Sequence, residues 1–158
     1  MAKPYNTVDG VTDVVSGYCG GDEADPTYEQ VKKQLTSHRE TVKIVFDPAI
    51  VSFEELLKVY FYNIDPFDGG GQFIDRGHSY TCAVYCTDEA QTAAVSAMIA
   101  QIEAQYGRKV CVSVEPYKRF YTAEEYHQDY AAKNPAEYEK EYIDSGRAAR
   151  KEDDRIQL

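Results

Sequence analysis

The sequence predicts an α+β fold in one domain. A chain of 158 residues is long enough to bury a hydrophobic core of its own. Strand-like and helix-like segments alternate along it, and two strands precede the first long helix. This order is typical of a split β-α-β pattern, which would place one more strand and one more helix ahead of the first visible strand.

The first half of the chain supplies two strands and two helices. Strands are expected over 11–18 and 41–48, and helices over 25–34 and 52–64. Thr27 and Gln30 have the spacing of a capping box, and so do Ser52 and Glu55. Both helices are therefore expected to begin at a defined residue.

The second half opens with an irregular stretch over 65–80, which is long enough to suggest a functional loop. A strand over 80–86, a helix over 88–107, a strand over 110–116 and a helix over 122–133 are expected to follow. The chain beyond Asn134 is polar and charged. We therefore expect a domain over 1–135 and a charged, flexible tail over 136–158.

The charge balance disfavours two classes of partner. Lysine and arginine number 17 against 27 acidic residues, a formal net charge of −10. Nucleic acids and anionic membrane surfaces both require basic clusters. No apolar run approaches the roughly 20 residues of a membrane-spanning helix, and no signal peptide is visible. The expectation is a cytoplasmic protein without nucleic-acid or membrane partners.

The cysteines give no metal-binding pattern. None of the four forms a C-x-x-C pair, and the chain has only three histidines. Cys82 and Cys86 would lie roughly 13 Å apart on an extended strand, too far for a disulfide. We expect Cys82, Cys86 and Cys111 to be buried structural residues, and the surroundings of Cys19 are left open.

Several polar residues near the expected ends of strands and helices are candidates for chemistry: Tyr28, His38, Glu40, Asp75, His78 and Tyr80. A carboxylic acid in an aromatic, water-poor pocket has a raised pKa and can donate a proton, while tyrosine hydroxyls can hold an acceptor oxygen. Simpler roles remain open, because Glu40 could be a solvated strand residue, Tyr28 a packing residue and Asp75 a turn former.

Four ordered segments resemble the A-type peptide-methionine sulfoxide reductases. They are GYCGGDEADPTYEQV, TSHRETVKIVFDPAIVSFEELL, IDRGHSYTCAVY and FYTAEEYHQDYAAKNP, and the resemblance runs from about Val11 to Pro135. It implies a two-layer, ferredoxin-like sandwich with an additional helix and strand, and reduction of methionine S-sulfoxide, free or in proteins, through a cysteine sulfenic acid. No bound cofactor is implied, and thioredoxin or another dithiol would be the external reductant and partner.

The resemblance also implies residue roles. Glu40 matches the proton donor, Tyr28 and Tyr80 match the tyrosines that hold the sulfoxide oxygen, and Asp75 matches the acid of the substrate loop. His127 and His38 match histidines of the family motifs and are assigned to substrate binding. Two of the motifs depart from the family pattern, at Ser37 and in the run from His78 to Cys82.

The family's Gly-Cys-Phe-Trp segment, which carries the nucleophile, does not occur in this sequence. We expect that segment, together with the first strand and most of the first helix of the fold, upstream of Met1. Two alternatives remain open. One is an inactive relative that binds methionine sulfoxide or a protein partner. The other is an unrelated acidic α+β interaction module.

Overall fold

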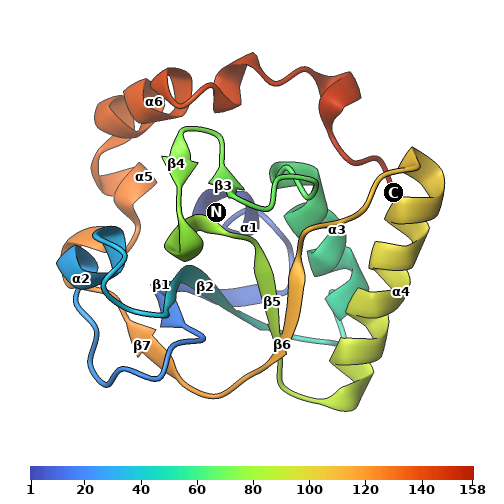
Figure 1. Ribbon diagram of the computed structural model, residues 1–158, viewed down its shortest axis with the longest axis horizontal. Helices are drawn as coiled ribbons and strands as arrows, with labels where there is room; N and C mark the ends of the chain where they lie inside the picture. Colours follow the sequence, from blue (N-terminus) through green and yellow to red (C-terminus); the bar gives the residue numbers. More distant parts are fainter.

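A computed structural model describes residues 1–158 and confirms the α+β class. The first sheet has the order β2-β1-β7 and contains β1 (Val11–Cys19), β2 (Arg39–Phe46) and β7 (Phe120–Thr122), all antiparallel (Figure 1). The sequence predicted the first two strands. It did not predict β7, which pairs with β1 only from Gly17 to Cys19. A Cβ atom on Gly17 would approach the Tyr121 carbonyl oxygen to 2.2 Å, so glycine permits this pairing.

The second sheet pairs β5 (Ala83–Cys86) with β6 (Ser113–Pro116) in parallel. The long helix α4 (Glu89–Tyr106) connects them, as parallel strands require. Asp88 caps the start of α4, and Gly107, with φ of 63°, ends it as predicted. Both strands are shorter than the sequence suggested, because Tyr80 belongs to a 3-10 turn and the Cys111 amide bonds instead to the Pro66 carbonyl oxygen.

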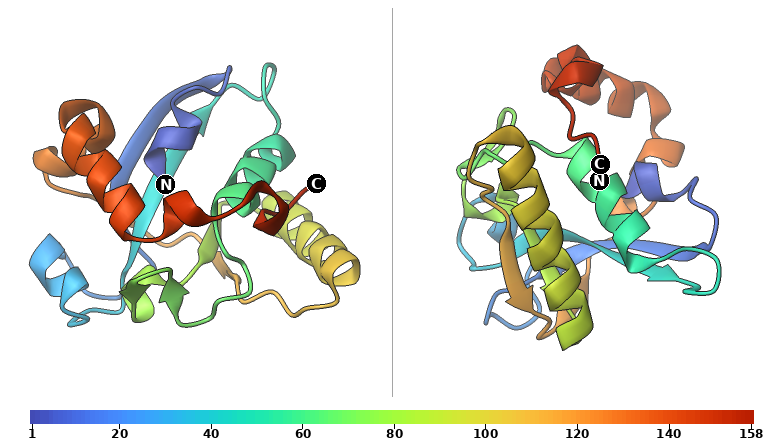
Figure 2. Two further views of the ribbon diagram at one scale, coloured as in Figure 1. Left: turned by 90° about the horizontal axis from the view of Figure 1, so that it is seen from above. Right: turned by 90° about the vertical axis from the view of Figure 1, so that its right-hand side faces the viewer.

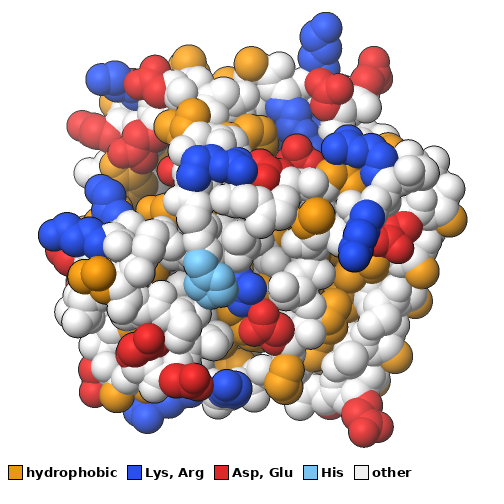
Figure 3. Space-filling view, in the orientation of Figure 1, with side chains coloured by type: hydrophobic (Ala, Val, Ile, Leu, Met, Phe, Trp, Pro, Cys, Tyr) orange, Lys and Arg blue, Asp and Glu red, His pale blue; other side chains and the backbone are white.

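The main hydrophobic core lies between the second sheet and two helices. Helix α3 (Phe53–Asn63) contributes Leu57 and Phe61, and α4 contributes Val95 and Ile102. The predicted Ser52–Glu55 capping box is present at the start of α3. Only 26 of 158 residues are buried, and hydrophobic side chains reach the surface on the face shown in Figure 3, so the core is small for the length of the chain.

A smaller cluster forms around the N-terminal helix α1 (Ala2–Tyr5). Tyr5 packs with Val51 and Leu56, and its hydroxyl donates to the Leu56 carbonyl oxygen at 3.3 Å. This contact brings the beginning of the chain against α3. No helix of the structure combines the length and the apolar character needed to cross a membrane.

The irregular stretch over 65–80 contains more regular structure than expected. It holds the short hairpin of β3 (Gly71–Gln72) and β4 (Asp75–Arg76), followed by the 3-10 turn η1 (His78–Tyr80). The Arg76 guanidinium donates to the Asp68 carboxylate at 2.9 Å and closes the hairpin from outside. The 65–80 segment is therefore an ordered part of the fold.

Two predicted helices are shorter than the sequence suggested. Helix α2 (Tyr28–Lys32) keeps the predicted cap at Thr27 but begins three residues late, because Asp25 adopts a positive φ of 48°. The segment predicted as a helix over 122–133 contains the end of β7, the 3-10 turn η2 (Glu125–His127) and α5 (Tyr130–Lys133). Thr122 pairs with Gly17 and so cannot cap a helix.

The segment beyond Asn134 differs from the expected unstructured tail. It forms α6 (Pro135–Asp144), then the 3-10 turns η3 (Arg147–Ala149) and η4 (Glu152–Asp154), and crosses the molecule from α6 toward the end of α4 (Figures 1 and 2). Ile156 is 3% exposed and belongs to the main core. The Arg150 guanidinium donates to the Ile64 carbonyl oxygen. The segment is held by a few residues near its end, Ile156 and Arg150, so its polar composition alone did not predict that it is structured.

A buried guanidinium joins the two sheets. Arg39 at the start of β2 is 8% exposed. It donates to the Thr81 and Tyr85 hydroxyls at 2.8 and 2.9 Å and to the Glu115 carboxylate at 2.8 Å. Because β2 and β5 do not pair directly, this network is the polar link between them.

Replacement of Arg39 by methionine should destabilise the fold by about 2–3 kcal/mol, because the Glu115 carboxylate and two hydroxyls lose a charged partner. Urea unfolding followed by circular dichroism measures the change. Lys118→Met is the matched control, since Lys118 and Asp22 form an ion pair at the surface and its loss should cost at most about 0.5 kcal/mol. Equal destabilisation by the two changes would contradict the role given to Arg39.

Candidate active site

Of the six residues to which the family resemblance gives roles, five line one cavity of about 830 Å³. They are Tyr28, Glu40, Asp75, Tyr80 and His127. They come from α2, β2, β4, η1 and η2, which are far apart in the sequence. The edge strands β2 and β5 both contribute to the wall, and so do α1, α3 and the C-terminal segment.

Glu40 is the acid of this cavity. It lies on β2 opposite Tyr18 of β1, beside the buried Arg39. Its side chain keeps solvent-exposed surface, but partial desolvation by the surrounding protein and the nearby Asp75 carboxylate raise its pKa, while the Tyr80 hydroxyl acts in the opposite direction. The result is a carboxyl that holds its proton at a higher pH than an ordinary glutamate does.

Asp75 and Tyr80 flank Glu40 from the 65–80 loop. The Arg147 guanidinium donates to the Asp75 carboxylate at 2.8 Å and lies over the Phe73 ring, so the C-terminal segment supplies a cation to this loop. Burial and the Glu40 carboxyl raise the pKa of Tyr80, which remains a neutral hydrogen-bond donor.

An aromatic group closes another side of the cavity. The His127 ring lies 4.3 Å from the Tyr28 ring and 4.3 Å from the Tyr126 ring. The Tyr28 hydroxyl makes no hydrogen bond within the protein, and His127 Nε2 is a buried atom without a hydrogen-bond partner, 3.9 Å from the Glu124 carboxylate. Burial lowers the pKa of His127, which favours the neutral ring. The aromatic rings give the cavity an apolar wall, and the Tyr28 hydroxyl and His127 Nε2 are polar atoms without a hydrogen-bond partner in the protein.

Glu124 organises this group, although the sequence did not single it out. Its carboxylate accepts the Tyr28 backbone N–H at 2.9 Å and the Tyr18 hydroxyl at 2.8 Å. Burial pushes its pKa upward, but these hydrogen bonds prevail and lower it. In the sequence, Glu124 stands out only because it lies three residues before His127. That position does not reveal its hydrogen bonds to Tyr28 and Tyr18, which lie 96 and 106 residues away.

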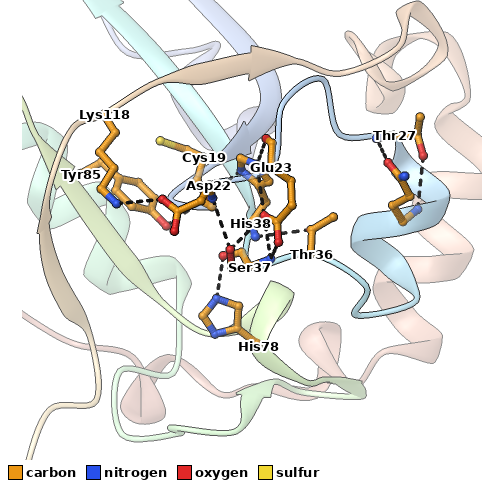
Figure 4. Close-up of polar contacts among 12 residues, drawn as sticks. Cys19, Asp22, Glu23, Thr27, Thr36, Ser37, His38, His78, Tyr85 and Lys118 are labelled. Atoms are coloured by element: carbon orange, nitrogen blue, oxygen red, sulfur yellow. Dashed lines mark hydrogen bonds and ion pairs between the residues drawn. The ribbon is translucent and has the colours of Figure 1, made fainter.

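The structure places His38 outside the cavity, and His78 does not line it either. It is fully buried and accepts the Gly21 N–H at Nδ1, with Nε2 2.8 Å from the Glu23 carbonyl oxygen. Figure 4 shows it beneath the 20–24 loop, with Ser37 bonded to Glu23 and His78 alongside. His38 therefore fixes that loop, and it does not line the cavity as the resemblance to the family motif implied.

The cysteines are distributed around the fold and form no disulfide. Cys82 alone lines the cavity, and burial raises the pKa of its thiol to about 11. Burial also raises the pKa values of Cys19 and Cys86. Cys111 is exposed, contrary to the prediction, because it lies in the loop before β6. Burial therefore disfavours the reactive thiolate form at each of these three thiols.

The cavity can therefore bind a group in which an acceptor oxygen lies beside apolar atoms. Tyr28 and Tyr80 offer hydroxyl donors, Glu40 offers a proton, and the rings of Tyr28, Tyr126 and His127 offer contacts to methyl or thioether groups. A leaving or developing oxide is stabilised by such an acid.

Comparisons with known proteins identify close relatives. A family model described as peptide methionine sulfoxide reductase matches residues 1–157. A protein named peptide methionine sulfoxide reductase MsrA 2 from Staphylococcus aureus strain MW2 is 46% identical over 151 residues, covering 94% of this chain and 85% of its own.

Two solved structures are also similar. Mxr1 from Saccharomyces cerevisiae in reduced form has a TM-score of 0.77 at 29% identity, covering 81% of this chain and 74% of its own. Methionine sulfoxide reductase A of Corynebacterium diphtheriae has a TM-score of 0.76 at 29% identity, covering 85% and 69%.

The raised pKa of Glu40 has a measurable consequence for stability. The folded state holds the Glu40 proton more tightly than the unfolded chain, so this group favours folding below the ordinary glutamate pKa and loses that contribution as pH rises through the folded pKa. Glu40→Gln should therefore gain stability relative to the unmodified chain between about pH 4 and pH 7. Urea unfolding over that range provides the measurement.

Glu55→Gln is the control for the sign. Hydrogen bonds from Ser52 lower the pKa of Glu55, so its contribution is present at neutral pH and lost in acid. This variant should lose stability relative to the unmodified chain as pH rises. A parallel response of the two variants would contradict the environment assigned to Glu40.

Proposed function

The chain belongs to the peptide methionine sulfoxide reductase family, and on that premise we propose that the Glu40 cavity binds methionine sulfoxide and supports its reduction to methionine. The observation that carries the proposal is that the Glu40 carboxyl and the Tyr28 and Tyr80 hydroxyls line one cavity, which has an aromatic wall. A sulfoxide presents one acceptor oxygen beside apolar methyl and methylene groups, which matches this lining. The activity would repair oxidised methionine, free or in proteins.

Each cavity residue has a role in the proposed reaction. The Tyr28 and Tyr80 hydroxyls donate to the sulfoxide oxygen, and Glu40 protonates it. A thiolate sulfur attacks the sulfoxide sulfur, the sulfur–oxygen bond breaks, and the oxygen ends on the attacking sulfur as a sulfenic acid while methionine leaves. Asp75 and His127 border the bound side chain and set its orientation, and we propose selectivity for the S epimer.

The attacking thiolate is the group that this cavity does not supply. A thiol with a pKa of about 11 at Cys82 is almost fully protonated at neutral pH. We propose that none of Cys19, Cys82, Cys86 and Cys111 is the nucleophile. Return of the sulfenic acid to a thiol consumes two thiol hydrogens and releases water, and we propose thioredoxin or a small dithiol as the external reductant.

The arrangement of the strands supports a ferredoxin-like layout as a finer description of the fold. β2 and β5 are both edges of their sheets, and both line the cavity. Unpaired strand edges favour the addition of another strand. We propose that an extended segment between them would convert the two sheets into one.

A second candidate function is binding without reduction, because the cavity has an acid and two tyrosines while burial opposes ionisation of its one thiol. In that case the chain binds methionine sulfoxide, or a protein that carries it, without reducing it. Binding and turnover therefore have to be measured separately.

Binding is tested by calorimetric titration of the chain with the S and R epimers of N-acetyl-methionine sulfoxide. We expect the S epimer to bind more tightly, and Tyr28→Phe or Tyr80→Phe to weaken its binding about fivefold, as the loss of one hydrogen bond of about 1 kcal/mol predicts. Tyr117→Phe, outside the cavity, should leave the affinity unchanged. A folded chain that binds neither epimer would refute the proposed site.

Turnover is tested with the same substrate and excess dithiothreitol. If no cysteine of the sequence is the nucleophile, the chain should produce methionine no faster than dithiothreitol alone. Turnover that disappears in Cys82→Ser, but persists in Cys111→Ser, would instead identify Cys82 as the reactive sulfur.

A further inference from the structure

The position of Tyr80 depends on a very short element. Tyr80 is the last residue of η1, a 3-10 turn of three residues between Gly77 and Thr81. A turn of this length has poor hydrogen-bond geometry and little stability of its own. Contacts from outside the turn must therefore decide where the Tyr80 hydroxyl lies.

The segment after α2 supplies those contacts. The Ser37 carbonyl oxygen lies 2.9 Å from His78 Nε2 (Figure 4), and Arg39 Nε donates to the Thr81 hydroxyl. Gln34 bonds to Ser79, the residue directly before Tyr80. Gln34, Ser37 and Arg39 therefore all contact residues 78–81.

Gln34 holds Ser79 through both ends of its side-chain amide. Gln34 Nε2 donates to the Ser79 hydroxyl at 2.6 Å, and Gln34 Oε1 accepts the Ser79 backbone N–H at 3.0 Å. Ser79 is 1% exposed, so its hydroxyl and backbone N–H have no access to water as an alternative partner. The contact fixes the residue directly before Tyr80 in both position and rotation.

Two local features show that the chain is shaped around this contact. Gln34 adopts a positive φ of 59°, which is unfavourable for a residue with a side chain. A Cβ atom on Gly77 would approach the Gln34 amide carbon to 2.7 Å, so the absence of a side chain at Gly77 admits the amide. The strained backbone at Gln34 and the missing side chain at Gly77 therefore both accompany the Gln34–Ser79 hydrogen bonds.

We propose that Gln34 is a positioning residue of the active site, which acts through Ser79 to hold the Tyr80 hydroxyl in the cavity beside Glu40. The inference rests on the proposed function for its relevance to sulfoxide binding, but its geometric part concerns the protein without ligand. Loss of the Gln34 amide frees η1 to shift, and the Tyr80 hydroxyl then leaves the Glu40 carboxyl. Because Tyr80 lowers the pKa of Glu40, its departure has a defined sign.

The first measurement uses the full chain without ligand. The pKa of Glu40 is followed by carbon-13 NMR titration of its carboxyl in the unmodified chain, Gln34→Ala and Ser79→Ala. We expect Gln34→Ala to raise the pKa of Glu40, and Ser79→Ala to raise it less, since the Ser79 N–H contact survives. Gln105→Ala is the matched control, because Gln105 bonds only to the Gln157 carbonyl oxygen at the surface.

The second measurement separates positioning from general structural damage. In a Tyr80→Phe background no hydroxyl remains to be positioned, so Gln34→Ala should not shift the pKa of Glu40 further. An unchanged Glu40 pKa in Gln34→Ala, or an equal shift in both backgrounds, would overturn the proposal. If Gln34→Ala does not fold, Ser79→Ala in the two backgrounds gives the same decision.

Affinity for N-acetyl-methionine-S-sulfoxide links this pair to function. Gln34→Ala should weaken binding about fivefold, as Tyr80→Phe does, and the double variant should be no weaker than Tyr80→Phe alone. An unmodified chain that does not bind the sulfoxide refutes the proposed function, whereas the Glu40 titration still decides the role of Gln34.

Discussion

The buried guanidinium of Arg39 is the constraint on which the rest of the structure depends. It bonds to Thr81, Tyr85 and Glu115, and thereby holds the β2 edge of one sheet against the β5–β6 pair of the other. A buried cation is tolerated only when its donors are satisfied, so the relative position of these elements is narrowly defined. Successive residues of a strand point to opposite faces, so the direction of Arg39 also determines that of Glu40.

The acid is maintained by a balance of opposing effects. Desolvation and the Asp75 carboxylate raise the pKa of Glu40, whereas Tyr80 and Lys32 lower it, and the first two prevail. Arg147 pairs with Asp75 from the C-terminal segment. That segment is anchored by Ile156 in the main core and by Arg150 on Ile64, so an apparently dispensable end of the chain contributes to the electrostatics of the cavity.

The proposed chemistry divides between groups of different kinds. Recognition of a sulfoxide oxygen needs hydrogen-bond donors, which the Tyr28, Tyr80 and Glu40 side chains provide. Attack on its sulfur needs a thiolate, and burial at Cys82 opposes the formation of one. Such a division allows binding and reduction to be separated by experiment.

The sequence by itself determined the α+β class, the two long helices, the capping boxes at Thr27 and Ser52, the Glu40–Tyr80–Tyr28–Asp75 group and the family resemblance. These features depend on local patterns: capping boxes, apolar periodicity and ordered motifs. Only the tertiary structure decided that β7 replaces the start of a helix, that the final residues are ordered, that His38 supports a loop, and that Glu124 and Gln34 organise the tyrosines. Each of these depends on a partner distant in the sequence, such as Gly17 for Thr122 or Ser79 for Gln34. Local propensity cannot encode contacts that exist only after the chain has folded.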